Sequence, residues 1–356
     1  MPSHVTGAYP MIMTIGETTE PKEKKTKMST SASSVDKNSS NGWIKLITND
    51  EVNKVLTWEV LIPAIRRALV AVSQGPNHPD GAIQPLRSFM PLPKQQGGML
   101  LMPGLVNDEA LAVKILTFLP KNSDHGHNTH SSNILLLHED TGLPAAFLQG
   151  EVITALRTAA SSAVATHELK VKGGCSSWTV AVLGAGVQAA SHARAMAHIL
   201  KLKKIIVWAR RTEAAEELCS TLRAEGIPAG TAHTVEEAVK EADVINSCTG
   251  TTSPILKLEW IKPGAHINSV GAPRPDQQEM EENLVHASTI YTDSYEAAYK
   301  ESGDVIKSKA TVFAEIGEVI LGKKPVLHEK TTIYKSLGIG VLDAVAAQIV
   351  YNQLMV

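Results

Sequence analysis

The chain has 356 residues, 43% of them hydrophobic, and a formal net charge of −2 at pH 7. This length is more than one ordinary hydrophobic core accommodates, so we expect a globular protein of two domains. The nearly balanced charge and the 4% content of aromatic residues argue against a nucleic acid partner. No segment reaches the roughly 20 apolar residues that a membrane-spanning helix needs, so we expect no membrane partner either.

The cysteines and the N-terminal segment bear on where the protein works. Cys175, Cys219 and Cys248 are odd in number and far apart, which argues against a disulfide framework or a thiolate metal site. They favour a reducing compartment, and the N-terminal pattern is neither that of a secretory signal nor that of a transit peptide, so we expect a cytoplasmic protein. Residues 1–42 include a long stretch of Lys, Glu, Ser and Thr without apolar periodicity, and we expect a disordered tail there.

The segments that follow the tail predict an α+β domain. We expect a strand at 43–48, a helix that begins with the capping-box residues Thr48 and Glu51, and a second helix over 57–73. Glycine, proline and Asn-Asp pairs then separate five apolar segments. We interpret these segments as strands at 82–90, 98–103, 110–118, 133–138 and 144–149.

From Gly150 onward, helices and strands alternate. The strands are expected at 178–183, 204–209, 243–248, 265–270 and 289–293, and the helices at 187–200, 212–225 and 234–241. These strands are apolar without alternation, as strands of a parallel sheet covered on both faces are. The sequence therefore predicts an α/β fold with a Rossmann-type dinucleotide-binding domain. The apolar segment 336–355 has helical spacing, and we expect it to pack back onto the first domain.

A glycine turn marks the expected nucleotide site. The segment VAVLGAGVQAAS (180–191) joins an apolar strand to a helix pattern through Gly184, Ala185 and Gly186. Gly184 permits the tight turn, Gly186 lets a pyrophosphate approach the backbone, and the small Ala189 lets the helix pack close to the strand. The free N–H groups and positive dipole end of that helix favour phosphate groups. The alternative is a glycine-rich turn that binds no ligand.

The next strand distinguishes two nicotinamide cofactors. An acidic residue at its end would accept hydrogen bonds from the ribose hydroxyls and repel a 2′-phosphate. This strand ends instead in Arg210 and Arg211, whose guanidinium groups suit a phosphate. We therefore expect NADPH rather than NADH, although a pair of solvated surface arginines is the alternative interpretation.

Two cations in apolar segments of the first domain are candidate substrate ligands. Arg87 follows AIQPL, and Lys114 lies within ALAVKILTF. A charge in such a strand is costly unless it is paired or serves a ligand, and two converging cations would bind a carboxylate. Edge-strand charges that face water are the alternative. The segment HGHNTH (125–130) contains three histidines in what we interpret as a polar loop, so we expect no metal site.

Six motifs in one order give the chain a family resemblance. LGAGVQA, EVITALRTAA, WIKPGAHINSVGA, EAAYKESGDV, AEIGEVI and KTTIYKSLG resemble the ornithine cyclodeaminase/mu-crystallin family. The resemblance implies a homodimer whose subunits each have two domains. One, formed by residues 43–152 and 330–356, carries the substrate site and the dimer interface, and the other, residues 153–329, is the Rossmann domain for NADP.

The resemblance also implies roles for single residues. Arg87 would hold the substrate carboxylate, Lys114 would lie near the imine, and Glu301 and Leu337 would close the pocket. Arg274 matches a further substrate contact. The implied cofactor contacts are His130, Arg157, Thr158, Gly184, Ala185, Gly186, Val187, Gln188, Arg210, Arg211, Thr249 and Val270.

Two departures separate the chain from parts of the family. Cyclodeaminases have an aspartate directly after the VG strand, where this chain reads VGAPRPD (270–276), with Asp276 too far along. This difference argues against cyclodeamination and favours the reductase branch. Pro273 stands where that branch tends to have serine, which weakens the expectation of thyroid-hormone binding known for vertebrate members.

The expected activity is therefore that of a ketimine reductase. It reduces, with NADPH, the C=N bond of small cyclic imine carboxylates such as piperideine-2-carboxylate, pyrroline-2-carboxylate and thiomorpholine-type ketimines. Lys114 or Glu301 would supply the proton for the imine nitrogen, and the sequence leaves this choice open. The alternatives are an ornithine cyclodeaminase or alanine dehydrogenase, and a binding protein for thyroid hormone or a structural protein of the lens.

Overall fold

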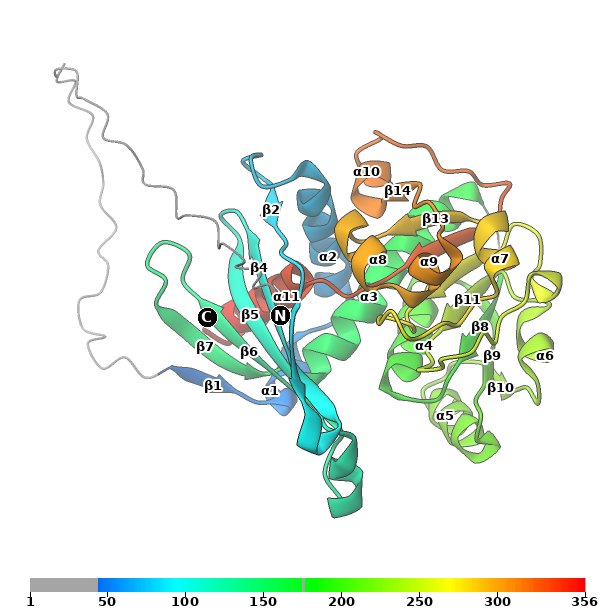
Figure 1. Cartoon of the computed structure of the whole chain (residues 1–356), viewed down its shortest axis with the longest axis horizontal. Coiled ribbons are helices and arrows are strands. Elements are labelled where there is room, and N and C mark those ends of the chain that lie inside the picture. Colours follow the sequence, from blue (N-terminus) through cyan, green and yellow to red (C-terminus); the bar gives the residue numbers. More distant parts are fainter. Residues whose placement is uncertain (1–43, 175–176, 356) are drawn as a thin grey trace, which may run out of the picture. The chain divides into compact units, whose positions relative to one another are not determined.

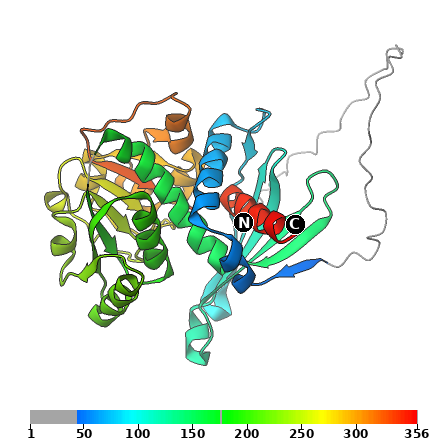
Figure 2. The same cartoon turned by 180° about the vertical axis from the view of Figure 1, so that it is seen from behind.

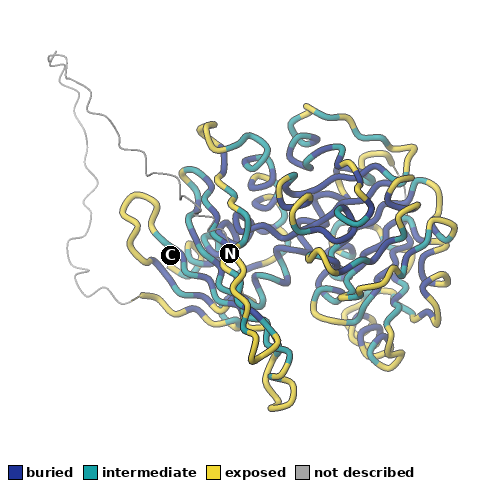
Figure 3. Tube along the Cα trace, viewed as in Figure 1, coloured by how far each residue is buried: buried dark blue, intermediate teal, exposed yellow. Residues whose placement is uncertain are grey.

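The computed structural model describes residues 44–174 and 177–355, so the tail expected over 1–42 lies outside the described residues. The described chain forms a seven-stranded sheet and an eight-stranded parallel sheet, with helices packed on both (Figure 1). Buried residues fill the space between each sheet and its helices, and exposed residues gather in the turns (Figure 3). The predicted α/β class is confirmed.

The first sheet is mostly antiparallel and runs in the order β1-β7-β6-β5-β4-β2, with β3 also paired to β4. Its strands are β1 (Lys45–Ile47), β2 (Ala82–Ile83), β3 (Ser88–Leu92), β4 (Gly97–Val106), β5 (Ala110–Phe118), β6 (His130–Leu137) and β7 (Pro144–Gln149). The connections include the 3₁₀ turns η1 (Pro93–Gln95) and η2 (Pro120–His125). The expected strand at 82–90 is broken over 84–87, where Pro85 cannot donate a ladder hydrogen bond, so Arg87 lies in an irregular segment.

Helices cover one face of this sheet. They are α1 (Asn49–Val55), α2 (Trp58–Gln74) and the C-terminal α11 (Gly340–Met355). The predicted capping box of α1 is present, because Thr48 Oγ1 accepts from the Glu51 N–H and the Glu51 carboxylate accepts from the Thr48 N–H. Viewed from behind, α11 lies across the sheet beside α2 (Figure 2).

A glycine pair sets how closely α11 approaches β4. A Cβ added at Gly104 would lie 2.4 Å from the Val341 backbone nitrogen, and one added at Gly340 would lie 2.4 Å from the Pro103 carbonyl oxygen. Real Cβ atoms do not approach backbone atoms so closely, so the first turn of α11 can rest on β4 only where both residues lack a side chain.

The second sheet is parallel throughout, in the order β10-β9-β8-β11-β12-β15-β13-β14. Its strands are β8 (Trp178–Leu183), β9 (Leu202–Trp208), β10 (Ala229–Thr231), β11 (Val244–Ser247), β12 (His266–Ser269), β13 (Thr289–Thr292), β14 (Ala314–Glu315) and β15 (Thr332–Lys335). The direction of progress along the sheet reverses between β8 and β11. In open α/β sheets, ligands bind outside the carboxyl ends of the strands at such a point.

The remaining helices connect these strands or join the two sheets. They are α3 (Glu151–Leu169), α4 (Val187–Ile199), α5 (Thr212–Ala224), α6 (Val235–Val239), α7 (Glu282–Ala287), α8 (Tyr295–Glu301), α9 (Gly303–Ser308) and α10 (Ile316–Ile320), with the 3₁₀ turns η3 (Val171–Gly173) and η4 (Leu258–Trp260). Helix α3 is buried over most of its length and packs against elements of both sheets, including β6 and β12. It therefore carries side chains to the place where the sheets meet.

The position of β15 differs from the predicted domain limits. The prediction assigns residues 330–356 to the first domain together with the C-terminal helix. Residues 332–335 form β15 instead, which pairs with β12 and β13 inside the parallel sheet. The chain crosses to the first sheet only at residues 336–339, after β15. The other domain limits stay a prediction.

Candidate functional site

A groove runs along the carboxyl ends of β8, β9 and β11, at the reversal of strand order. It has a volume of about 570 Å³. It is lined by Gly184, Ala185, Gly186, Trp208, Ala209, Arg210, Arg211, Ala214, Thr249, Gly250, Thr251, Thr252 and Ile255. Six residues predicted to contact the cofactor are in this lining. The groove is therefore at the position where a dinucleotide is expected in such a sheet.

The glycine turn fits a phosphate group. Gly184 has a φ of +113°, and a Cβ there would lie 2.8 Å from the Cys248 carbonyl oxygen, so the tight turn requires glycine. A Cβ at Gly186 would meet no atom within 4 Å and would project into open space, so glycine leaves that space free for a ligand. No side chain caps α4, whose first residue Val187 is 70% exposed, so its N–H groups can serve an anion.

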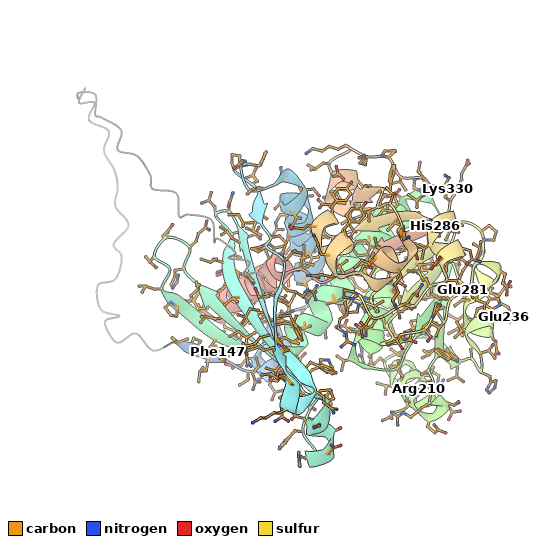
Figure 4. The ribbon with its side chains drawn as sticks, in the orientation of Figure 1. Phe147, Arg210, Glu236, Glu281, His286 and Lys330 are labelled. Carbon is orange, nitrogen blue, oxygen red and sulfur yellow. The ribbon has the colours of Figure 1, made fainter. Side chains whose placement is uncertain are left out.

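Arg210 and Arg211 stand at the edge of this groove. Both residues are exposed, and Arg211 is the residue that precedes helix α5. Figure 4 labels Arg210 where its side chain leaves the ribbon near α5. Two exposed guanidinium groups beside a groove provide the charge and the donors that a phosphate ester requires.

A second group of charged side chains lies where the first sheet meets α3 and α11. Lys114, on β5, is 1% exposed, and its Nζ lies 2.7 Å from Oδ2 of Asp343. Arg157, on α3, places Nε 2.8 Å from the other oxygen of the same carboxylate. Arg157 Nη1 is buried without a hydrogen-bond partner in the described chain. A buried donor without an acceptor is costly, so this atom is available to an anionic ligand.

The pKa of Lys114 is lowered to about 7, chiefly by burial and also by the positive charges of Arg157 and Arg87, while Asp343 acts in the opposite direction. An amine with such a pKa is divided between its protonated and neutral forms near neutral pH. It can therefore give up and regain a proton under physiological conditions, which an ordinary lysine cannot do readily.

Arg87 reaches the same region from the irregular segment between β2 and β3. Its Nη2 lies 2.7 Å from Glu301 Oε2 and donates to the Leu337 carbonyl oxygen over 2.6 Å. Burial raises the pKa of Glu301, although the charge of Arg87 lowers it. Arg87 and Glu301 border a narrow cavity with about 10 Å³ of free space, which is lined by Gln84, Pro85, Leu86, Arg87, Met102, Ser294, Ala297, Glu301 and Ile339. Met102 is the register partner of Lys114.

The segment between β15 and α11 brings these groups together. The buried carboxylate of Asp293 accepts from the N–H groups of Leu337 and Gly338, each over 2.8 Å. Gly338 has a φ of +73°, and its missing side chain leaves room for Arg157, whose Nη1 lies 2.5 Å from where a Cβ would be. The Val341 N–H donates to Gln84 Oε1 over 2.9 Å. This segment and helix α11 after it thus contact the elements that carry all three cations.

Two of these residues are absent from the prediction. Asp343 is a single carboxylate in an apolar helix, which is the same signal that identified Lys114 in its strand. Asp293 directly follows the apolar strand β13, in the position at a carboxyl end where site residues of parallel sheets occur. Both signals are visible in the sequence, but neither shows which groups the carboxylate contacts in the fold.

Other predicted residues border the loop that follows β12. The predicted substrate contact Arg274 pairs with Asp276, with Nε 3.1 Å from Oδ1, and its guanidinium carbon lies 6.0 Å from the centre of the Phe118 ring. The ring of the predicted cofactor contact His130 packs at a tilt against Phe118, with ring centroids 4.6 Å apart. These contacts link the ends of β5 and β6 to the loop after β12.

The remaining predicted cofactor contacts make hydrogen bonds within the chain. Thr158 Oγ1 donates to the Thr154 carbonyl oxygen over 2.7 Å, and Gln188 Nε2 lies 3.5 Å from the same oxygen. The Val270 N–H donates to the Ser247 carbonyl oxygen over 2.9 Å. These hydrogen bonds do not test the predicted contacts with a cofactor, which stay predictions.

Within residues 44–174 and 177–355, no three His, Cys, Asp or Glu side chains gather in a way that could hold a metal ion, and the HGHNTH segment is no exception. None of the helices described is long and apolar enough to cross a membrane.

Comparison with known proteins identifies the family. The model of the ornithine cyclodeaminase/mu-crystallin family matches residues 44–356. The chain belongs to the ornithine cyclodeaminase/mu-crystallin family. Among relatives, it is 43% identical over 308 residues to the ketimine reductase mu-crystallin of Rattus norvegicus, covering 86% of this chain and 96% of the rat protein.

Two solved structures of the same fold are also similar. The Δ1-pyrroline-2-carboxylate reductase of Thermococcus litoralis, in complex with NADH and L-proline, is 31% identical with a TM-score of 0.81, and the match covers 88% of this chain and 98% of that one. An archaeal alanine dehydrogenase dimer with bound NAD is 26% identical with a TM-score of 0.80 and coverage of 88% and 96%.

Proposed function

We propose that the protein is an NADPH-dependent reductase of small cyclic imines that carry a carboxylate. The observation that carries this proposal is the buried Lys114, with a pKa of about 7, which is influenced by two arginines and is the register partner of Met102 in the lining of a narrow cavity. This arrangement combines a proton donor with anion-binding groups. The relatives named as ketimine and pyrroline-carboxylate reductases support the same chemistry.

The side chains divide the work of binding and proton transfer. Arg87, with the unpartnered Nη1 of Arg157, would bind the substrate carboxylate. Lys114 would donate a proton from Nζ to the imine nitrogen, since an iminium accepts hydride far better than a neutral imine. Lys114 suits this step better than Glu301, whose nearest partner is the guanidinium of Arg87. When bound, the reduced nicotinamide supplies the hydride that the imine carbon receives.

The cofactor proposal rests on the groove at the switch of strand order. Gly184, Gly186 and the uncapped start of α4 would hold the pyrophosphate. Arg210 and Arg211 would bind a 2′-phosphate, which favours NADPH over NADH. The solved relatives described above contain NADH or NAD, so cofactor preference has to be measured on this chain.

A small substrate is favoured over a large ligand. Drug-sized molecules occupy pockets of about 300–1,000 Å³. The free space at Arg87 is far smaller, about 10 Å³, so any substrate requires Arg87 and Glu301 to move apart. A five- or six-membered ring requires a smaller movement than an iodothyronine does. The cyclodeaminase alternative is disfavoured because Ala272 and Pro273 follow Gly271 where that activity has an aspartate.

We also propose a homodimer formed through the uncovered face of the first sheet. Along β5, Ala112 and Lys114 are buried on the helix-covered side, whereas Leu111, Val113 and Ile115 alternate to the other side and are partly exposed. Leu46, Leu101 and Leu143 are among the exposed apolar residues of this sheet and its turns. Extended apolar faces of this kind are usually interfaces. Val113→Lys is expected to yield monomers in analytical ultracentrifugation. A mass equal to that of the wild type would refute the proposal that this face forms the dimer interface.

The function is tested with a panel of substrates. Loss of NADPH absorbance is followed with Δ1-piperideine-2-carboxylate, Δ1-pyrroline-2-carboxylate and an acyclic 2-oxo acid with ammonia. We expect turnover of the cyclic imines, a preference for NADPH over NADH, and release of no ammonia from ornithine. Ammonia release from ornithine, or oxidation of alanine without imine reduction, would contradict the proposal.

A further inference from the structure

One buried carboxylate, Asp343, contacts two of the three cations at the proposed substrate site. It is 1% exposed, and its two oxygens lie 2.7 Å from Lys114 Nζ and 2.8 Å from Arg157 Nε. An ion pair with so little contact with water is only weakly screened. Its presence requires a reason, because burying three charged groups costs more than burying apolar side chains of similar size.

The position of Asp343 is imposed by backbone packing. The close contact of Gly104 with Gly340 fixes the first turn of α11 on β4. Met102 on β4 and Lys114 on β5 are register partners, so their side chains point to the same face of the sheet, the face under α11. Asp343 lies one turn after Gly340 and therefore meets Lys114 beside the cavity that Met102 lines.

The charges around Lys114 show what Asp343 contributes. Arg157 on α3 and Arg87 on the segment between β2 and β3 both oppose protonation of the amine, and Asp343 favours it. The nearby acids Glu301 and Asp293 have other partners, namely the Arg87 guanidinium and the N–H groups of Leu337 and Gly338. Without Asp343, a dry amine would face two guanidinium groups and would lose its proton.

We propose that Asp343 is a positioning residue for imine reduction, which holds Lys114 Nζ beside the cavity and keeps the amine protonated until the imine nitrogen takes the proton. This inference rests on the proposed function. In the step, the Nζ–H bond breaks, an N–H bond forms with the lone pair of the imine nitrogen, and Lys114 becomes neutral. Asp343 stays ionised throughout, and the lysine regains its proton from solvent after the product leaves.

The first experiment measures binding without catalysis. The affinity of pyrrole-2-carboxylate, a planar carboxylate that is not an imine, is measured by calorimetry across pH. In the wild type, binding is expected to weaken as pH rises through the pKa of Lys114, and Lys114→Met is expected to remove this break. In Asp343→Asn, the break is expected to move about one to three pH units lower, the effect of an opposite charge at this distance.

The second experiment measures reduction. At about pH 7.5, Asp343→Asn is expected to lower kcat about eightfold or more, because a fall of one unit from a pKa of about 7 reduces the protonated fraction of the lysine from about a quarter to about 3%. Asp343→Glu retains the charge on a longer side chain. It should lower kcat, while the pH at which ligand binding weakens stays that of the wild type. Glu225→Gln is the matched control, since Glu225 forms an exposed ion pair with Arg194.

The outcomes distinguish this inference from the proposed function. Suppose that the wild type reduces cyclic imines, but that binding to Asp343→Asn weakens at the same pH as binding to the wild type. This result would overturn only the proposed role of Asp343. Absence of imine reduction in the wild type would overturn the proposed function, and the role in proton transfer with it. If Asp343→Asn does not fold, a moved break in Asp343→Glu overturns the proposal and an unmoved break with reduced kcat supports it.

Discussion

The glycine contact between β4 and α11 provides a sharp prediction, because it links packing to the proposed chemistry. In Gly104→Ala, the new Cβ would lie 2.4 Å from the Val341 nitrogen, 2.6 Å from the Gly340 carbonyl carbon and 2.7 Å from the Val341 Cα. All three are backbone atoms, so no side-chain rotation relieves the contact. Ordinary separations are about 3.5 Å or more, and the start of α11 must therefore move by about 1 Å.

Two consequences follow from a shift of this size. Overpacking of a close-packed interface costs about 1–3 kcal/mol, which corresponds to a fall in Tm of several degrees for a chain of this length. The same shift draws Asp343 away from Lys114, whose ion pair is 2.7 Å long. Since a misplacement of about 1 Å can cost about a hundredfold in rate, we expect kcat for imine reduction to fall at least about tenfold.

The assay compares Gly104→Ala with Gly230→Ala by thermal unfolding and by steady-state kinetics. Gly230 lies in β10, and a Cβ added there would meet no atom within 4 Å, so this control is expected to change neither Tm nor kcat appreciably. A Gly104→Ala protein with the Tm and kcat of the wild type would refute the reasoning. It would show that α11 is not held on β4 by this contact.

Three further predictions concern arginine and histidine side chains. Arg87→Ala should raise KM for carboxylate-bearing imines at least about tenfold, because the anion loses a charge-assisted hydrogen bond; an unchanged KM would remove that role. Replacement of both Arg210 and Arg211 by alanine should lower the preference for NADPH over NADH by about tenfold or more in cofactor titrations, and an unaltered ratio would count against a phosphate site. His192 and His266 are buried, and burial lowers their pKa to about 4 and about 3 from 6.5. The unfolded chain therefore binds more protons below pH 6.5, so the stability that the neutral histidines contribute is present above that pH and is lost as pH falls toward 3–4. At about pH 5, each histidine lowers the free energy of unfolding by about 2 kcal/mol relative to neutral pH. Urea unfolding of His266→Gln should therefore show a smaller fall in this free energy between neutral pH and pH 5 than the wild type does.

Six of the residues that the sequence predicts as cofactor contacts line one groove, and their signals are local. The glycine turn, the helix after it and the arginines of the next strand each lie within a few residues of one another. Parallel strands bring their carboxyl ends to one edge, so these separate motifs line one groove. The family resemblance adds the order of the motifs and the reductase branch, and the match over residues 44–356 confirms the family.

The organisation of the proposed substrate site depends on contacts that no local pattern reveals. Asp343 and Lys114 are far apart in the sequence, and their contact depends on the Gly104–Gly340 approach. The four-residue strand β15 is too short for a clear pattern, and its position between β12 and β13 depends on pairing with strands formed much earlier. Arg87 is singled out in the sequence as an unusual cation, whereas the break in its strand at Pro85 is not predicted.

Transfer of an isotope tests the central claim most directly. Reduced NADP deuterated at the nicotinamide C4 position is incubated with the wild-type protein and Δ1-piperideine-2-carboxylate, and the product is examined by mass spectrometry and NMR. We predict pipecolate with one deuterium on the ring carbon that bears the carboxylate, and loss of this product in Lys114→Met. Product without deuterium at that carbon, or no product while the protein releases ammonia from ornithine, would contradict imine reduction.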